Sequence, residues 1–188
     1  MKQDITAGSK IKSIREMKSV SRETLAERSG LSTEQIAQIE EGDSLSLSPL
    51  IQIARALGVR LGTFLDDIES DQPAVCHKDE RDKGVRFISS KDTLNHLDYY
   101  SLARSKSGRY MEPFFIEINN TGNDDFKFSS HEGEEFLYCL EGAVEVVYGN
   151  KQYRLNAGDS IYYDSIIDHC IKSVAGSAKI LAVVYAPN

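Results

Sequence analysis

Cysteine and proline are scarce in this sequence, and long apolar runs are missing. The three cysteines of the 188-residue chain include no CxxC pair, which excludes a disulfide framework and a zinc knuckle. Only four prolines accompany 40% hydrophobic residues, so a disordered or collagen-like chain is excluded too. No apolar run approaches the roughly 20 residues that span a bilayer, and the N-terminus lacks the apolar core of a signal peptide. We therefore expect folded domains, a cytoplasmic location and no membrane partner.

Motifs of several catalytic classes are also missing. The sequence has no glycine-rich phosphate loop, no GxSxG nucleophile elbow, and no cysteine placed with a histidine and an orienting acid. Phosphate-loop chemistry and nucleophilic hydrolysis therefore find no support in the sequence.

The net charge of −7 is divided unevenly along the chain. Residues 1–60 carry nine Lys or Arg and eight Asp or Glu, whereas the remainder carries thirteen and twenty-one. This asymmetry indicates two domains, which we place at residues 1–66 and 85–188, with a polar linker at 67–84. Any contact with nucleic-acid phosphates would concentrate in the basic N-terminal segment. Its six basic residues are Lys2, Lys10, Lys12, Arg15, Lys18 and Arg22.

Apolar residues recur at helical spacing through the first domain, in short runs with breaks between them. Ser32 followed by Gln35 forms the pattern of a capping box, which predicts a helix over residues 33–41. Ser48 followed by Pro49 predicts the cap and first turn of the next helix. The other expected helices start near Ile11 and near Arg22, and a short one covers residues 63–66.

Two helices joined by a tight turn at SGLS, inside a five-helix unit, are the arrangement that places the second helix in a DNA major groove. The segments LAERSGLS and IEEG resemble the phage-repressor helix-turn-helix family of the XRE, or Cro/C1, type, over residues 8–66. The resemblance implies that Lys18 and Arg22 anchor phosphates and that the second helix reads base edges. Its implied base-reading residues are Ser32, Thr33, Glu34, Gln35 and Gln38. Because this helix has no Lys or Arg, a helical bundle that keeps the fold without binding DNA is the alternative.

Beyond Val85 the pattern changes to short segments rich in Tyr, Phe, Val and Ile. Turn signals at LEG, YGN, NAGDS and VAGS separate them, so the second domain is expected to hold about nine strands in an antiparallel sandwich or barrel. The nine segments are VRFIS, LDYYSLA, PFFIEI, EEFLYCL, AVEVVYG, KQYRL, DSIYYD, HCIKSV and AKILAVVYA.

Polar motif residues lie just before or at the start of two of these segments. His131 and Glu135 come before Gly142, which ends the segment that holds Glu135, and Gly158 and Asp159 later precede His169. This order resembles the two motifs of the cupin family, a small jelly-roll barrel, over residues 110–186. The resemblance implies that His131, Glu135 and His169 are metal ligands. The expected fold is therefore multidomain, with a five-helix repressor-like helix-turn-helix domain followed by a cupin β-barrel.

Ser129 stands where the cupin pattern has a further histidine, so the resemblance implies three ligands and not four. Two imidazoles and one carboxylate leave coordination positions open, as in non-haem Fe(II) oxygenases. The chain also resembles iron-dependent epoxidases of the helix-turn-helix and cupin type, whose three ligands align with the same residues. The sequence leaves two alternatives for these three residues. They either hold a divalent ion (Fe, Zn, Mn or Ni) or are polar pocket residues without a metal. The expected ligand-pocket residues are Ser129, Tyr99, Tyr100, Tyr162 and Tyr163; adjacent Tyr162 and Tyr163 point to opposite faces, so one of them can line the barrel.

Two functions follow from these patterns. The favoured one is a transcription regulator that binds a double-stranded DNA operator as a homodimer, while its barrel senses an unknown small-molecule effector. The other is a non-haem Fe(II)-dependent oxygenase or epoxidase that keeps the helical domain as a scaffold or lid. The first is favoured because the whole DNA-binding architecture is retained.

Overall fold

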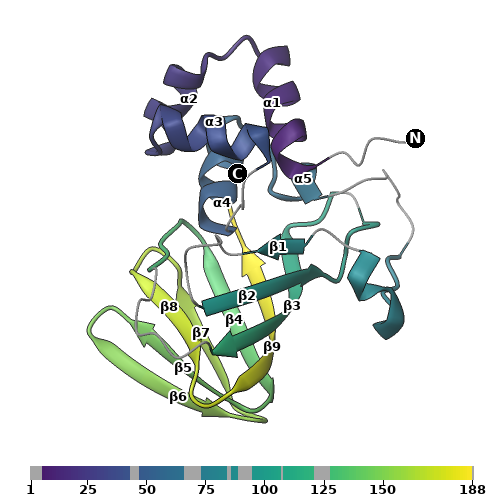
Figure 1. Cartoon of the computed structure of the whole chain (residues 1–188), viewed down its shortest axis with the longest axis vertical. Coiled ribbons are helices and arrows are strands. Elements are labelled where there is room, and N and C mark those ends of the chain that lie inside the picture. Colours follow the sequence, from purple (N-terminus) through teal and green to yellow (C-terminus); the bar gives the residue numbers. More distant parts are fainter. Residues whose placement is uncertain are drawn as a thin grey trace.

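Five helices pack together at one end of the molecule, and a barrel of two β-sheets forms the other end (Figure 1). This arrangement confirms the expected fold class. Among the residues described, no helix has the length and apolar character that crossing a membrane requires. The computed structural model describes residues 6–42, 47–65, 73–83, 86–88, 95–106, 108–120 and 128–187.

Local capping chemistry sets the ends of the helices. At the start of α3 (Thr33–Glu41), Ser32 Oγ accepts the backbone N–H of Gln35 at 3.1 Å, and Gln35 Oε1 accepts the N–H of Ser32 at 2.8 Å, which completes the capping box. Gly42 ends α3 in the left-handed conformation. The remaining helices are α1 (Ala7–Met17), α2 (Arg22–Ser29), α4 (Leu47–Ala56) and α5 (Gly62–Leu65). Their common core contains the fully buried residues Ile11, Leu25, Ile36, Leu50 and Phe64.

The predicted start of α4 is wrong by a residue or more. The helix already includes Leu47, so Ser48 is not its N-cap, and the Ser48 hydroxyl instead donates to the carbonyl oxygen of Ser130 at 3.2 Å. A serine cap is only a local preference, and here a contact between the two domains uses the hydroxyl. The last short helix covers Gly62–Leu65, and position 66, where the prediction ended it, lies outside the described residues.

Close packing of α1 on α3 depends on a glycine. A Cβ built on Gly8 would lie 2.1 Å from the carbonyl oxygen of Ile39, so a larger residue would push the two helices apart. The end of α3 is thereby seated directly against α1.

The nine predicted strand segments all form strands, and neighbouring strands pair antiparallel. One sheet has the order β1-β2-β3-β9-β4-β7 and the other β6-β5-β8. Inward-facing residues such as Leu137, Ile180 and Val184 alternate with outward-facing ones and fill the barrel. The strands are β1 (Arg86–Ile88), β2 (Asn95–Ser101), β3 (Met111–Asn120), β4 (Glu134–Glu141), β5 (Ala143–Tyr148), β6 (Lys151–Asn156), β7 (Ser160–Asp164), β8 (His169–Ser173) and β9 (Ser177–Tyr185).

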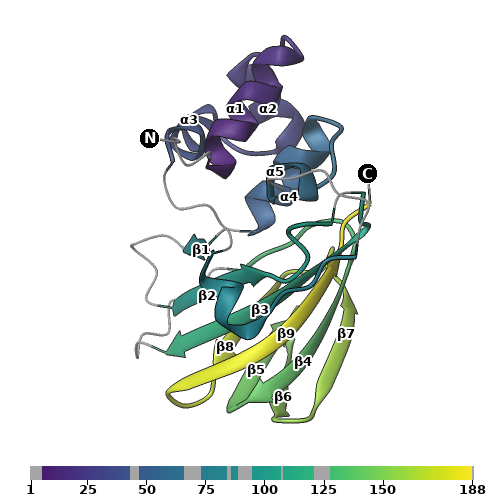
Figure 2. The same cartoon turned by 90° about the vertical axis from the view of Figure 1, so that its right-hand side faces the viewer.

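One end of the barrel faces the helical domain. The end of β9 points toward the helices, and α4 lies directly over this end of the strands in both views (Figure 2). Along the chain between the two domains, residues 78–83 form a 3-10 helix that the sequence pattern did not predict. The guanidinium of Arg81 lies 4.4 Å from the centre of the Phe115 ring, which holds this segment on the outer face of the larger sheet. The domain boundaries at residues 66 and 84 stay a prediction.

Candidate functional site

Three polar side chains meet inside the barrel near the end that faces α4. His131 comes from the loop before β4, Glu135 from β4 and His169 from the start of β8. One ligand atom of each lies within 4.8 Å of the others. Glu135 Oε1 is 2.7 Å from His131 Nε2 and 3.5 Å from His169 Nε2. All three residues are at most 6% exposed.

Backbone contacts fix the orientation of both imidazoles. His131 Nδ1 lies 3.1 Å from the carbonyl oxygen of Glu132, and His169 Nδ1 lies 2.8 Å from that of Ile167. A carbonyl oxygen can only accept a hydrogen bond, so each Nδ1 carries the proton. In the neutral ring, Nε2 therefore presents its lone pair to the point where the three side chains meet.

The two carboxylate oxygens of Glu135 have different partners. Oε2 accepts a hydrogen bond from the hydroxyl of Tyr163 at 2.7 Å, while Oε1 faces the histidines. Burial alone would raise the pKa of Glu135, but when the Nε2 atoms of His131 and His169 are also protonated, their hydrogen bonds and charge outweigh it and hold this pKa well below its usual range. Burial raises the pKa of Tyr163, and the Glu135 carboxylate raises it further, so the tyrosine stays a hydrogen-bond donor.

These residues fit a divalent metal ion. Lone pairs on two imidazole nitrogens and one carboxylate oxygen converge in a buried place, and only protons or a cation between them relieve their repulsion. The donor set is the two-histidine, one-carboxylate set of non-haem iron sites, and it also suits other first-row divalent ions. An ion held by His131, Glu135 and His169 would act as a Lewis acid with open positions for a small ligand.

Of the other predicted pocket residues, Ser129, Tyr163 and Tyr99 lie on the inner side. Ser129 and His169 pair as an isolated antiparallel bridge, with N···O distances of 2.8 and 2.9 Å, and paired residues place their side chains on the same face. Tyr99 packs edge-on against the buried Phe114. Burial raises the pKa of Tyr99, and the charge of Glu135 adds to this effect.

The prediction that Tyr100 and Tyr162 line the pocket is wrong. Tyr162 is 61% exposed and follows the opposite face of β7 from Tyr163. Tyr100 follows the opposite face of β2 from Tyr99, where its hydroxyl is 3.4 Å from Glu117 and its ring packs near Phe115. Side chains alternate along a strand, so a pair of adjacent tyrosines cannot both line the barrel.

Two residues near the site were missed by the sequence analysis. Gly133, between the first histidine and the glutamate, has a φ of 113°, and a Cβ there would lie 1.9 Å from the Tyr185 carbonyl oxygen. The backbone carbonyl oxygen of Ser165 accepts the backbone N–H of His131 at 2.9 Å, and the backbone N–H of Ser165 donates to the carbonyl oxygen of Gly133 at 2.8 Å. A glycine inside the motif was a visible signal, whereas the role of Ser165 depends on a distant segment folding back.

The predicted DNA-reading helix presents a polar outer face. Thr33, Glu34, Gln35 and Gln38 are exposed, and Ile36 and Ile39 on the other side of α3 are buried. The capping box, however, uses Gln35 Oε1. Gln35 therefore has only its amide N–H₂ left for the base contact predicted for it, so the predicted pairing of a glutamine with adenine would depend on Gln38. Ser32 is exposed, and its oxygen is similarly occupied by the Gln35 N–H.

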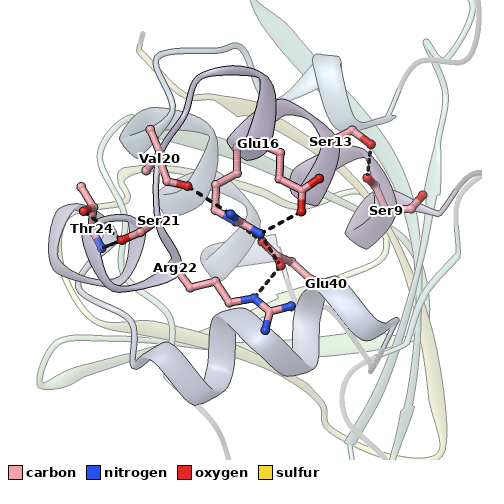
Figure 3. A network of polar contacts seen from close by, with 9 residues as sticks. Ser9, Ser13, Glu16, Val20, Ser21, Arg22, Thr24 and Glu40 are labelled. Carbon is pink, nitrogen blue, oxygen red and sulfur yellow. Dashed lines mark hydrogen bonds and ion pairs between the residues drawn. The ribbon is translucent and has the colours of Figure 1, made fainter.

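Arg22 has a structural contact that the sequence did not predict. Its Nε donates to Glu40 Oε2 at 2.8 Å, as Figure 3 shows. Arg15 donates to the same carboxylate through Nε at 2.5 Å and Nη2 at 3.0 Å, and its Nη1 donates to the Val20 carbonyl at 3.0 Å. Glu40 has no exposed side-chain surface, so it adds little repulsion toward phosphates. Arg22 thus joins α2 to α3, and the phosphate contact predicted for it stays a prediction.

The remaining predicted phosphate contacts lie on the α1 side of the domain. Lys18 is exposed at the C-cap of α1, and Lys12 is exposed one turn and a half earlier. Because Arg15 and Arg22 are paired with Glu40, these lysines are the more accessible of the basic residues named in this segment. Lys2 lies outside the described residues.

Comparison with known families agrees with this architecture. Residues 11–64 match the family described as Helix-turn-helix, and residues 117–184 match the family described as Cupin domain. Two matches to separate families thus cover the helical bundle and most of the barrel.

Two curated relatives span nearly the whole chain. (S)-2-hydroxypropylphosphonic acid epoxidase of Streptomyces wedmorensis is 31% identical, and the match covers 92% of each chain. The HTH-type transcriptional regulator PuuR of Escherichia coli (strain K12) is 26% identical, and the match covers 95% of this chain and 94% of the regulator. The chain is thus similar over both domains to an enzyme and to a regulator.

Solved structures repeat the same two similarities. An HTH_3 family transcriptional regulator from Vibrio cholerae covers 97% of this chain and superposes with a TM-score of 0.69 at 22% identity, which supports the fold alone. The Fe(II) form of HppE covers 95% of this chain, with a TM-score of 0.52 and 28% identity. The chain therefore belongs to the family in which an XRE-type helix-turn-helix domain precedes a cupin domain, the family of (S)-2-hydroxypropylphosphonic acid epoxidase and of regulators such as PuuR.

Proposed function

We propose that this chain is a DNA-binding transcription regulator whose cupin domain binds a divalent metal through His131, Glu135 and His169 and responds to a small-molecule effector. The observation that carries the proposal is the outer face of α3, where Thr33, Gln35 and Gln38 are exposed on a helix seated by a complete capping box. Similarity to PuuR over both domains supports it.

Recognition would rest on amide and hydroxyl groups, and affinity on a few lysines. Gln38 can pair with an adenine through both polar atoms of its amide, since no contact of its own helix occupies them in the way that capping occupies Gln35. One subunit offers few basic residues and one half-site. A twofold dimer doubles both and matches a palindromic operator, so the proposal includes a homodimer.

Selection from a randomised duplex pool, followed by titration of the enriched duplex at two salt concentrations, tests DNA binding. With Lys12 and Lys18 from each of two subunits on phosphates, log K should fall against log salt with a slope of about −4. Lys18→Ala should reduce that slope by about 2 in the dimer, since each subunit loses one contact. Gln38→Ala should weaken binding to the enriched duplex about tenfold or more and leave binding to unrelated duplex unchanged.

Thr63→Ala, exposed on α5, is the matched control and should bind as the wild type does. Failure to enrich any duplex, together with no binding at low salt in the presence or absence of divalent metal, would refute the regulator.

A second candidate is a non-haem iron oxygenase or epoxidase. The observation in its favour is the buried histidine and glutamate cluster, in a chain 31% identical to (S)-2-hydroxypropylphosphonic acid epoxidase. The residues beside this cluster include Tyr99, Tyr163 and Ser129. All three are uncharged and offer no cation to a phosphonate, so this candidate stands second.

Phosphorus NMR of (S)-2-hydroxypropylphosphonic acid mixed with Fe(II)-loaded protein tests the second candidate, with dioxygen or hydrogen peroxide as the oxidant. Under that candidate the substrate signal is replaced by a product signal, and His131→Ala removes the conversion because a ligand is lost. An unchanged substrate signal with both oxidants, from protein that retains its iron, excludes this reaction.

A further inference from the structure

Both chain neighbours of His131 contact the same helix of the DNA-binding domain. Ser48 Oγ, in the first turn of α4, donates to the Ser130 carbonyl oxygen at 3.2 Å. Arg55 Nη1, two turns later on α4, lies 2.5 Å from Glu132 Oε1. The loop that carries the first histidine is therefore held on either side by one helix.

The same loop also holds the imidazoles in place. Glu132, whose carboxylate pairs with Arg55, uses its carbonyl oxygen to fix His131 Nδ1 at 3.1 Å. Ser129 is the backbone partner of His169 through two hydrogen bonds. Residues 129–132, here called the histidine loop, thus touch both histidines and α4.

α4 cannot shift without the rest of its domain. Leu50, Ile53 and Ala54 of this helix are at most 3% exposed and lie in the helical core. Close-packed elements move as units, so a displacement of the histidine loop would be passed to the helix-turn-helix as a change in its placement.

The exposure of Arg55 and Glu132 indicates how their ion pair acts. The side chains of Arg55 and Glu132 are 56% and 43% exposed, so the ion pair by itself contributes little to stability. Its consequence is instead geometric, because it fixes the residue whose carbonyl orients a metal-ligating ring. Groups that orient ligands in this way change metal affinity by about 10- to 100-fold, and Arg55 acts one bond farther out.

We propose that Ser48 and Arg55 are positioning residues for His131, and that their contacts with the histidine loop couple occupancy of the barrel site to the placement of the helix-turn-helix domain. The inference rests on the proposed function in one respect, namely that His131, Glu135 and His169 bind a metal. Coupling is reciprocal, so α4 also sets the metal affinity of the barrel.

Titration of the full chain with Co(II), followed by calorimetry, tests the first part. Replacing Ser48 and Arg55 together by alanine should weaken Co(II) binding about threefold to tenfold. Glu132→Arg alone should weaken it similarly, and Arg55→Glu with Glu132→Arg should restore most of the loss, because the ion pair is re-formed in reverse. Rescue by the reversed pair is a result that general loss of stability would not produce.

Lys179→Ala is the matched control, because it breaks an ion pair of similar exposure, between Lys179 and Glu141, in the same barrel but outside the histidine loop. It should leave the Co(II) affinity unchanged. Circular dichroism should show native helix content in every variant.

Helix unfolding measured by far-ultraviolet circular dichroism tests the second part. In the wild type, saturating Co(II) should raise the unfolding midpoint of the helices, and in the Ser48 and Arg55 double variant this increase should be lost. Equal Co(II) affinity in all variants overturns the inference while the metal site of the proposed function stands. No Co(II) binding by the wild type overturns both.

Discussion

His131→Ala is expected to lower the affinity of the chain for a divalent metal by more than about 100-fold, since loss of a ligand must exceed the effect of losing one of its outer partners. Glu135 and His169 would remain, but two donors at one side of an ion do not hold it against water. Equilibrium dialysis against Fe(II), Mn(II), Zn(II) and Co(II), followed by metal analysis, measures the loss.

His77→Ala is the matched control for this experiment. His77 is exposed and lies in the segment before the 3-10 helix, away from the three converging side chains, so its removal should leave metal binding unchanged. A wild-type chain that retains no metal after dialysis, or a His131→Ala variant that binds as tightly as the wild type, would contradict the assignment of the site.

Metal binding should also be visible as stability of the barrel. An ion at 100 times its dissociation constant adds about 2.7 kcal/mol to the free energy of unfolding of the state that binds it. All nine tyrosines lie in the second half of the chain, from Tyr99 to Tyr185, so tyrosine fluorescence reports on the barrel. Chelation should lower the unfolding midpoint seen by this probe in the wild type and leave it unchanged in His131→Ala.

Glu40→Ala is expected to destabilise the helical domain by about 3 kcal/mol. The Glu40 side chain has no exposed surface and accepts hydrogen bonds from Arg15 and Arg22, and the Arg15 side chain is only 9% exposed. Removing the carboxylate would leave a buried guanidinium without its counter-charge, which costs far more than the loss of a surface ion pair. Denaturant unfolding followed by far-ultraviolet circular dichroism measures this change.

Glu41→Ala is the matched control, since Glu41 is the next residue of α3 and is exposed. It should change the free energy of unfolding by no more than about 0.5 kcal/mol. If Glu40→Ala and Glu41→Ala unfold alike, the Arg15, Glu40 and Arg22 contacts do not stabilise the domain.

The same carboxylate should make the stability of the helical domain depend on pH. Burial alone would raise the pKa of Glu40, but the hydrogen bonds from Arg15 and Arg22 outweigh it and lower this pKa in the folded state. The unfolded chain then binds a proton more readily than the folded one. The contribution of Glu40 is therefore fully present above its unfolded pKa of about 4.3 and is lost as the pH falls through the lower folded value. Glu40→Gln should remove this part of the pH dependence.

Much of the fold could be predicted because its signals are local. Ser32 and Gln35 satisfy each other's backbone within one turn, so a capping box can be recognised from four adjacent residues. The strand segments alternate apolar and polar residues over a few positions and end at turn residues such as Gly149 and Asn150. Where a distant partner competes, local prediction fails, as at Ser48, whose hydroxyl contacts Ser130 instead of capping α4.

The order of motif residues alone determined that this chain joins a helix-turn-helix to a cupin and that His131, Glu135 and His169 are candidate ligands. Sequence could not decide which tyrosine lines the barrel, because adjacent strand residues are equivalent until one face of the sheet is covered. The structure decided it by pairing Tyr163 with Glu135. Only the tertiary structure showed that Arg15 and Arg22 converge on Glu40 and that α4 holds the histidine loop, since contacts between residues 18 to 82 positions apart leave no periodic pattern along the chain.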